Sequence, residues 1–128
     1  MSEAVSDAAL LALADAASER AYAPYSRFHV GCAVLARDGR VIEGVNVENA
    51  AYPLGVCAER TAFARAVSEG YRPGDFSAAA ITASPCGGCR QWLLEMGVEK
   101  VLFRNGGRVV TMSPSELLPE SFEAADLP

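Results

Sequence analysis

Three cysteines and one glutamate constrain this 128-residue chain more than any other feature of its sequence. Glu59 follows Cys57 by two residues, and Cys86 and Cys89 form a Pro-Cys-x-x-Cys pair further along. Structural zinc sites usually fill all four tetrahedral positions with protein ligands, whereas catalytic sites leave one position for water. Three thiolates therefore predict a catalytic zinc site, with Glu59 placed to move protons for the water. The fold must bring these two distant segments together.

The overall composition is ordinary for a soluble globular protein, with 51% apolar and 21% charged residues. The length predicts a single domain over residues 1–128. The net charge is −5, and no run of lysine or arginine interrupts the acidic balance. A phosphate backbone would be repelled by this charge, so we expect no nucleic acid polymer as partner. A small neutral substrate is compatible with it.

The N-terminal segment lacks the charge pattern of a secretory signal peptide. Residues 8–14 are apolar, but Glu3 and Asp7 lie where a signal peptide would carry positive charge. The sequence contains no apolar stretch long enough for a membrane span, so we expect no membrane partner. The expected compartment is the cytoplasm, where reduced thiols favour metal binding over disulfides.

Hydrophobic periodicity and turn residues predict a chain in which helices and strands alternate. Asp38-Gly39 predicts a hairpin between the first two strands, and the short gap at 104–107 makes the last two strands antiparallel. The expected fold class is α/β, a three-layer α/β/α arrangement with a mixed five-stranded sheet whose last strand is antiparallel. The expected strands are residues 28–35, 41–45, 77–82, 100–103 and 108–112. The expected helices are residues 6–21, 57–70, a helix with Ser84 as N-cap and Pro85 as first residue that ends at Gly97, and a turn at 113–116.

The predicted ligands all lie at helix N-termini, whose partial positive charge stabilises thiolates. Three thiolates and one Zn²⁺ still leave a net negative charge, so further donors are expected. We assign Arg60 and Gln91 as donors to the thiolates. A solvated surface position for Arg60 is an equally open interpretation. The pair Gly87-Gly88 suggests that the backbone approaches the metal or substrate closely, the alternative being a loose turn.

The chain resembles the small homotetrameric zinc-dependent cytidine deaminases over nearly its full length. The resemblance is carried by residues 25–31, 46–50, 57–61, 85–91 and 117–122. It implies a cytidine deaminase-like fold, one Zn²⁺ per subunit, and a homotetramer that shares its sites between subunits. It also implies hydrolytic deamination of cytidine and deoxycytidine to uridine and deoxyuridine, with release of ammonia, in pyrimidine salvage. In that mechanism a zinc-activated water attacks C4 of cytosine while Glu59 carries protons to N3 and to the departing ammonia.

The resemblance further implies residues that contact the nucleoside substrate. Phe28 would stack on the pyrimidine ring, and Asn46 and Glu48 would hydrogen-bond the ribose hydroxyls. The backbone near Ala58 would bind the edge of the base. Phe122 would reach the site from a neighbouring subunit. Without the resemblance, Phe28 would be interpreted as a core strand residue and Phe122 as the anchor of a disordered tail.

Three alternatives were weighed against this interpretation. A non-catalytic zinc-binding module would need Cys32 or His29 as a fourth ligand, although core packing is the expected role of Cys32. A thiol redox protein would use Cys86 and Cys89, and would make Cys57 incidental. A deaminase of a modified aminopyrimidine nucleoside, such as a nucleoside antibiotic, would keep the metal machinery and change the sugar contacts.

Overall fold

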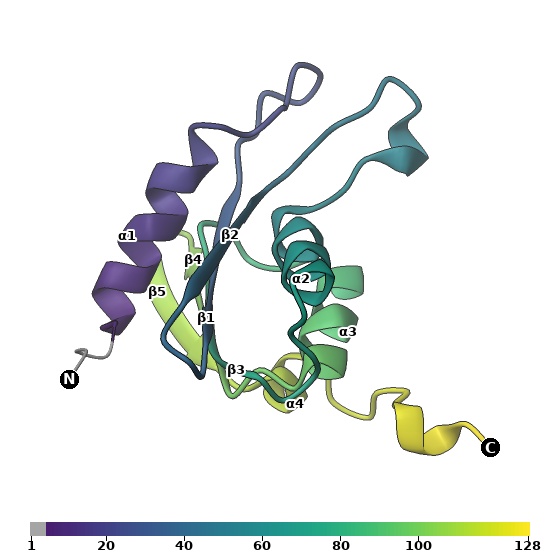
Figure 1. Ribbon diagram of the computed structural model, residues 1–128. Helices are drawn as coiled ribbons and strands as arrows, with labels where there is room; N and C mark the ends of the chain where they lie inside the picture. The colour runs from purple at the N-terminus through teal and green to yellow at the C-terminus, as the bar shows by residue number, and fades with distance from the viewer. Residues whose placement is uncertain (1–4) are drawn as a thin grey trace.

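A five-stranded mixed sheet forms the centre of the computed structural model, which describes residues 5–128 (Figure 1). The strand order is β2-β1-β3-β4-β5. β1 is antiparallel to both β2 and β3, β3 and β4 are parallel, and β5 is antiparallel to β4. The predicted mixed sheet with an antiparallel last strand is therefore confirmed. The strands are β1 Gly31–Ala36, β2 Val41–Val45, β3 Phe76–Ile81, β4 Lys100–Asn105 and β5 Arg108–Met112.

Helices cover both faces of the sheet, which confirms the three-layer α/β/α architecture. α1 lies on one face, and α2 and α3 lie side by side on the other (Figure 1). The helices are α1 Asp7–Ser18, α2 Ala58–Ser68, α3 Gly87–Met96 and the short α4 Pro114–Leu117, with 3₁₀ turns at Tyr52–Leu54 and Ala124–Asp126. Within residues 5–128, no helix combines the length and the apolar character needed to cross a membrane.

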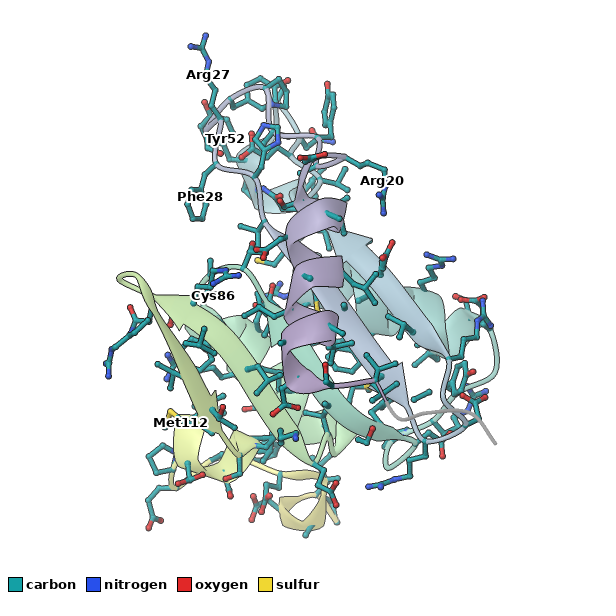
Figure 2. All side chains as sticks on the ribbon, turned by 90° about the vertical axis from the view of Figure 1, so that its left-hand side faces the viewer. Arg20, Arg27, Phe28, Tyr52, Cys86 and Met112 are labelled. Atoms are coloured by element: carbon teal, nitrogen blue, oxygen red, sulfur yellow. The ribbon has the colours of Figure 1, made fainter. Side chains whose placement is uncertain are left out.

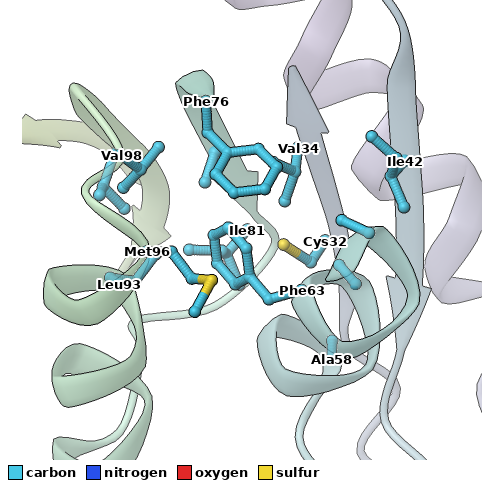
Figure 3. Close-up of a cluster of buried hydrophobic side chains, with 14 of the residues drawn as sticks. Cys32, Val34, Ile42, Ala58, Phe63, Phe76, Ile81, Leu93, Met96 and Val98 are labelled. Carbon is cyan, nitrogen blue, oxygen red and sulfur yellow. The ribbon is translucent and has the colours of Figure 1, made fainter. Parts of the chain in front are cut away.

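The hydrophobic core is divided by the sheet into two clusters. The larger cluster lies between the sheet and the pair α2 and α3, where Phe63 and Phe76 meet edge to face with ring centroids 5.2 Å apart (Figure 3). Cys32 is fully buried in this cluster, so the interpretation of Cys32 as a core residue is confirmed. The smaller cluster packs Leu10 and Leu11 of α1 against Leu102 and its neighbours on the opposite face.

Two glycines allow the helices to lie directly on the strands. A Cβ atom on Gly44 of β2 would overlap the backbone of Ala58 and Ala62 in α2. A Cβ atom on Gly31 of β1 would in the same way overlap the backbone of Ala14 in α1. Real Cβ atoms do not make such contacts, so only glycine permits this approach. Gly44 therefore fixes the position of α2, the helix that begins with the Cys57 segment.

The first strand begins later than the sequence predicted. Phe28 and Val30 are apolar, but their backbone hydrogen bonds go to Asn46, mainly to its side chain, and not to a strand ladder. The Val30 N–H donates to Asn46 Oδ1 at 2.8 Å, and Asn46 Nδ2 donates to the Phe28 carbonyl at 2.8 Å. The strand starts at Gly31, and residues 22–30 form a long loop that projects from the sheet (Figure 1).

The prediction of Ser84 as the N-cap of the third helix was wrong. Cys86 is the N-cap, with extended backbone at φ −68° and ψ 168°, and the helix begins at Gly87. Pro85 is therefore outside the helix, and the Ser84 hydroxyl accepts a hydrogen bond from Arg90 Nη2 at 3.3 Å. The first helix was predicted more closely: Ser6 caps it by accepting from the Ala9 N–H at 3.1 Å.

Candidate active site and metal centre

Three cysteine sulfurs converge where the N-termini of α2 and α3 meet. Cys57 is the N-cap of α2, Cys86 is the N-cap of α3, and Cys89 lies in the first turn of α3. The Cys57 and Cys86 Sγ atoms are 4.0 Å apart, and all three sulfurs lie within 4.8 Å of one another. The structure thus brings together the three residues that the sequence proposed as metal ligands.

The geometry of this cluster fits one zinc ion. Tetrahedral coordination with Zn–S bonds of about 2.3 Å places neighbouring sulfurs about 3.8 Å apart, close to the observed spacing. Among residues 5–128, the cluster contains Cys57, Cys86 and Cys89 and no fourth cysteine, histidine or carboxylate. The closed four-ligand site that required Cys32 or His29 is therefore not formed. The donor set leaves the fourth position of the ion open.

Three thiolates beside Glu59 would concentrate negative charge that a cation can balance. Burial raises the pKa of Cys89 far above its usual value, and the negative charge of Glu59 adds to the effect. Burial also raises the pKa of Cys57. The pKa of Cys86 is lowered, because hydrogen bonds from Cys89 and Cys57 outweigh its burial. Mutual repulsion opposes three thiolates at one point, and a divalent ion supplies the missing positive charge.

Glu59 is buried beside the cluster, with only 3% of its surface exposed. It occupies the first turn of α2, directly after Ala58. Burial raises the pKa of Glu59, and its own backbone N–H, the Cys89 thiol and the Arg60 charge offset this only in part. A carboxyl group whose pKa moves towards neutrality is suited to accept and return a proton.

Arg60 lies against the cysteine cluster, which argues against a solvated surface position. Its Nε atom is buried and has no hydrogen-bond partner within residues 5–128. Burial lowers the pKa of Arg60, but the three neighbouring sulfurs raise it more, beginning with Cys89. A Cβ atom on Gly88 would overlap the Arg60 guanidinium, whereas Gly87 faces open space. Gly88 thus makes room for Arg60, and the close approach of this pair to metal or substrate stays a prediction.

Gln91 does not contact the thiolates, contrary to the sequence prediction. Its Nε2 donates a hydrogen bond to the Phe122 carbonyl at 2.7 Å, so Gln91 instead holds the C-terminal segment against α3. The Phe122 side chain is 60% exposed and does not line the pocket of its own chain. Sequence spacing could not reveal this contact, because it depends on where the tail docks.

A cavity of about 270 Å³ opens in front of the cysteine cluster. The cavity brings Glu59, Cys57 and Cys86 together with four of the five residues that the sequence proposed for substrate binding. The fifth, Phe122, does not line it. Figure 2 shows Phe28 on the projecting loop above Cys86, and both residues line the cavity. The lining residues are Ser26, Phe28, Val30, Asn46, Glu48, Cys57, Ala58, Glu59, Ile81, Ala83, Ser84 and Cys86.

Internal hydrogen bonds hold Asn46 and Glu48 at the cavity wall. Both amide atoms of Asn46 bind the backbone of the projecting loop, as described above. Glu48 Oε1 accepts from the N–H groups of Tyr25 and Ser26, each at 3.0 Å. Glu48 Oε2 accepts from the Ser26 hydroxyl. The sequence indicates Ser26 only as part of a motif, although serine hydroxyls commonly bond the backbone N–H two residues on, as Ser26 does with Phe28.

Arg90 is a second residue whose part in the site was not predicted. Its Nε donates to the Pro85 carbonyl at 2.9 Å and its Nη2 to the Ser84 hydroxyl at 3.3 Å. Its Nη1 donates to the Leu117 carbonyl of α4 at 3.0 Å. One guanidinium therefore ties the segment before Cys86 to the end of α4.

An open three-thiolate metal site beside a buried carboxyl, on an α/β/α sheet, is the arrangement of a zinc-dependent deaminase. The family described as "Cytidine and deoxycytidylate deaminase zinc-binding region" matches residues 4–105, and the chain belongs to this family.

Similar proteins cover nearly the whole chain. The cytidine deaminase of Halalkalibacterium halodurans is 48% identical over 120 residues, which are 87% of this chain and 89% of the relative. The cytidine deaminase of Sporosarcina psychrophila is 45% identical over 127 residues, 92% of each chain. The crystal structure of cytidine deaminase from Burkholderia pseudomallei superposes with a TM-score of 0.85 at 45% identity, covering 91% of this chain and 99% of that one.

Proposed function

We propose that this protein catalyses the hydrolytic deamination of cytidine and deoxycytidine to uridine and deoxyuridine, with release of ammonia. The observation that carries the proposal is the cavity in which Phe28, Asn46 and Glu48 face the thiol cluster and Glu59. An aromatic face, polar groups for a sugar, a metal site and a buried acid together suit a nucleoside and no smaller metabolite. The cytidine deaminases similar to this chain support the same substrate class.

The side chains of the cavity account for each part of this reaction. Zinc, when held by the three cysteines, supplies the Lewis acidity that activates a water molecule towards C4 of the base. The Glu59 carboxylate would take one proton as the water adds and pass it to N3, then take the second proton from the hydroxyl at C4 and pass it to the departing amino group. One water is consumed and one ammonia leaves, so the carboxyl is regenerated. The helix N-termini and Arg60 offset the negative charge of the thiolates.

Recognition of the nucleoside is divided among three elements. Phe28 offers a ring face for stacking on the pyrimidine, and Asn46 and Glu48 offer polar atoms to the ribose hydroxyls. Ala58 is the first residue of α2, where backbone N–H groups have no partner within the helix and are free to bind the base edge. Arg60 and the cysteines lie behind these groups, so the reacting carbon would face the metal.

The assembly is proposed to be a homotetramer whose sites are shared between subunits. Two loops, residues 22–30 and 46–57, project together from the sheet (Figure 1). They expose large apolar side chains, among them Tyr22 at 55%, Leu54 at 68% and Tyr52 at 75%, of which Tyr52 is labelled in Figure 2. Apolar surface of this kind favours a contact with another protein chain, and a second copy is the simplest partner. Phe122, which is outside its own pocket, would then complete the pocket of a neighbour. The reduced thiols of the site suit the cytoplasm, where the enzyme would serve pyrimidine salvage.

The decisive experiment follows ammonia release from cytidine, deoxycytidine and cytosine by the purified protein, with and without a zinc chelator. We expect both nucleosides to react, the free base to react poorly, and chelation to abolish turnover until zinc is restored. Chelator-resistant activity, or no activity on either nucleoside, would contradict the proposal. A strong preference for a modified aminopyrimidine nucleoside over cytidine would favour that alternative instead.

A further inference from the structure

We infer that Ser26 is a positioning residue for nucleoside binding, because its hydroxyl links the Glu48 carboxylate to the backbone of Phe28. The inference rests on the proposed function, and it adds a residue that determines how the sugar and the base are held. Ser26 lines the cavity, and the two residues it connects are those proposed for the ribose and for the pyrimidine ring.

The Ser26 hydroxyl makes one hydrogen bond in each direction. It donates to Glu48 Oε2, and it accepts from the Phe28 N–H at 3.0 Å. The Ser26 N–H also donates to Glu48 Oε1 at 3.0 Å. The hydroxyl oxygen of Ser26 thus connects the Glu48 carboxylate directly to the Phe28 backbone. Alanine at this position would remove both side-chain bonds and leave the backbone bond.

The turn between these residues needs external support. Arg27 lies between Ser26 and Phe28 with a φ of 61°, in the left-handed region that non-glycine residues seldom adopt. Such a conformation persists only when surrounding contacts fix it. The available contacts are the Arg27 N–H, which donates to the Ala23 carbonyl at 3.0 Å, and the two bonds of the Ser26 hydroxyl. The Ser26 side chain thus supports the backbone conformation from which Phe28 projects.

The same contacts prepare Glu48 for hydrogen bonds to a sugar. The Ser26 side chain is the largest influence on this carboxyl and lowers its pKa, with help from the Ser26 and Tyr25 backbone N–H groups. An ionised carboxylate accepts hydrogen bonds from hydroxyl groups more strongly than a neutral acid does. An ionised carboxylate can accept about four hydrogen bonds. Two are taken at Oε1 and one at Oε2, so Oε2 keeps a lone pair for a sugar hydroxyl. Ser26 therefore acts on sugar recognition through Glu48.

The test compares cytidine with 2′,3′-dideoxycytidine, which lacks both ring hydroxyls. Ser26→Ala is expected to raise KM for cytidine about tenfold, the effect of losing one hydrogen bond to a charged group. The rise for the dideoxynucleoside should be clearly smaller, because only the Phe28 contribution is lost there. Zinc content should match the parent, and kcat should change little. Ser68→Ala, an exposed serine at the end of α2, is the matched control.

Two further measurements keep the inference open to refutation. In a Glu48→Ala background, Ser26→Ala should add much less to KM for cytidine than it does alone, because the two residues act as one unit. Ser26→Thr keeps the hydroxyl and should retain parental kinetics. Ser26→Val has the shape of threonine without the hydroxyl and should not. This pair isolates the hydroxyl if alanine impairs folding. Equal losses on both nucleosides, independent losses in the double variant, or parental kinetics for Ser26→Val would overturn the inference.

Failure of the inference can be told from failure of the proposed function. Binding of uridine to the parent protein is measured by calorimetry beside the kinetics. A parent that neither binds uridine nor deaminates any nucleoside would overturn both statements. A parent that deaminates cytidine, with a Ser26→Ala variant of unchanged KM, would overturn only the role of Ser26.

Discussion

Glu59 is a charged side chain in a place where charge is costly. Its carboxyl is nearly inaccessible, and burial raises its pKa although its backbone N–H, Cys89 and Arg60 all act in the opposite direction. A carboxylate placed this way is stabilised by receiving a proton, and a neighbouring substrate nitrogen can take that proton away. Burial therefore gives Glu59 the properties of a proton carrier without any contribution to ligation.

The substitution Glu59→Gln tests this role. The amide keeps the size of the side chain but cannot carry a proton, so turnover of cytidine should fall by about 10²- to 10⁴-fold. Zinc content, measured by elemental analysis, should stay at one ion per chain because Glu59 is no ligand. Glu95→Gln, which changes an exposed glutamate of α3, serves as control. Turnover near the parental value in Glu59→Gln would contradict the assignment.

At the residue scale, sequence reasoning reached the groups whose spacing carries chemical information. Cys57, Cys86 and Cys89 were recognisable because metal coordination restricts residue type and distance along the chain. Ser26 and Gln91 were not, because serine and glutamine side chains have many acceptable partners. The partners that they have, Glu48 and the Phe122 carbonyl, are brought to them only by the folded loop and tail.

At the scale of elements, the start of α3 is determined by contacts outside the helix. Arg90 of α3 binds the Pro85 carbonyl and the Ser84 hydroxyl before the helix, and the Leu117 carbonyl at the end of α4. These bonds fix the extended backbone that directs the Cys86 side chain towards the other sulfurs. A planar guanidinium suits three acceptors in different directions, which a lysine ammonium on a flexible chain does not.

Replacing Arg90 by lysine should weaken metal retention more than it weakens the fold. Loss of a residue that orients metal ligands typically costs about 10- to 100-fold in metal affinity. Zinc release to a chromogenic chelator should accordingly be faster in Arg90→Lys, with an unchanged circular dichroism spectrum. Arg72→Lys is a matched control, because Arg72 also donates to two carbonyls, those of Val67 and Tyr71, away from the site. Equal release from both variants would rule out this role.

Some element boundaries are determined by residues next to them in the sequence, and others by contacts with distant residues. β2 was predicted at its observed bounds and the start of α1 to within one residue, because hairpin and capping signals lie next to the elements they define. β1 was predicted too early because residues 28–30 have the composition of a strand. The Asn46 side chain takes the place of a strand partner there, and composition does not report such a contact.

At the scale of the whole molecule, the described chain leaves its pocket open on one side. Phe28 is 61% exposed although it lines the cavity, and Phe122 is exposed on a tail that Gln91 holds away from the cavity. The projecting loops add further exposed aromatic surface beside the pocket, including Tyr52. The proposed homotetramer would cover these groups and supply Phe122 from a neighbouring subunit.

Mixing two inactive variants tests whether Phe122 acts across subunits. Phe122→Ala retains Glu59 but lacks the ring, and Glu59→Gln has the ring but no proton carrier. Hybrid oligomers, formed by co-expression with two affinity tags, should contain complete pockets and deaminate cytidine well above the sum of the separate variants. The oligomeric mass is measured by light scattering on the same samples. Additive rates in hybrids of confirmed composition would exclude a shared site.

The layered architecture was predictable because its determinants are spread along the chain. Two hairpins and two helical crossovers, one from β2 through α2 to β3 and one from β3 through α3 to β4, leave few ways to arrange five strands. The close packing of α2 on β2 was not predictable. It depends on Gly44, whose lack of a side chain has meaning only once the helix lies above it.

The residues proposed to bind the nucleoside, Phe28 on one projecting loop and Asn46 and Glu48 on the other, are separate from the residues proposed for the chemistry, which lie at two helix N-termini. Among residues 22–30 and 46–57, only Val30, at the base of the first loop, packs against the core clusters that hold the helices on the sheet. The cavity is in this sense modular. Engineers who seek acceptance of altered nucleosides can diversify the loops and leave the reactive centre untouched.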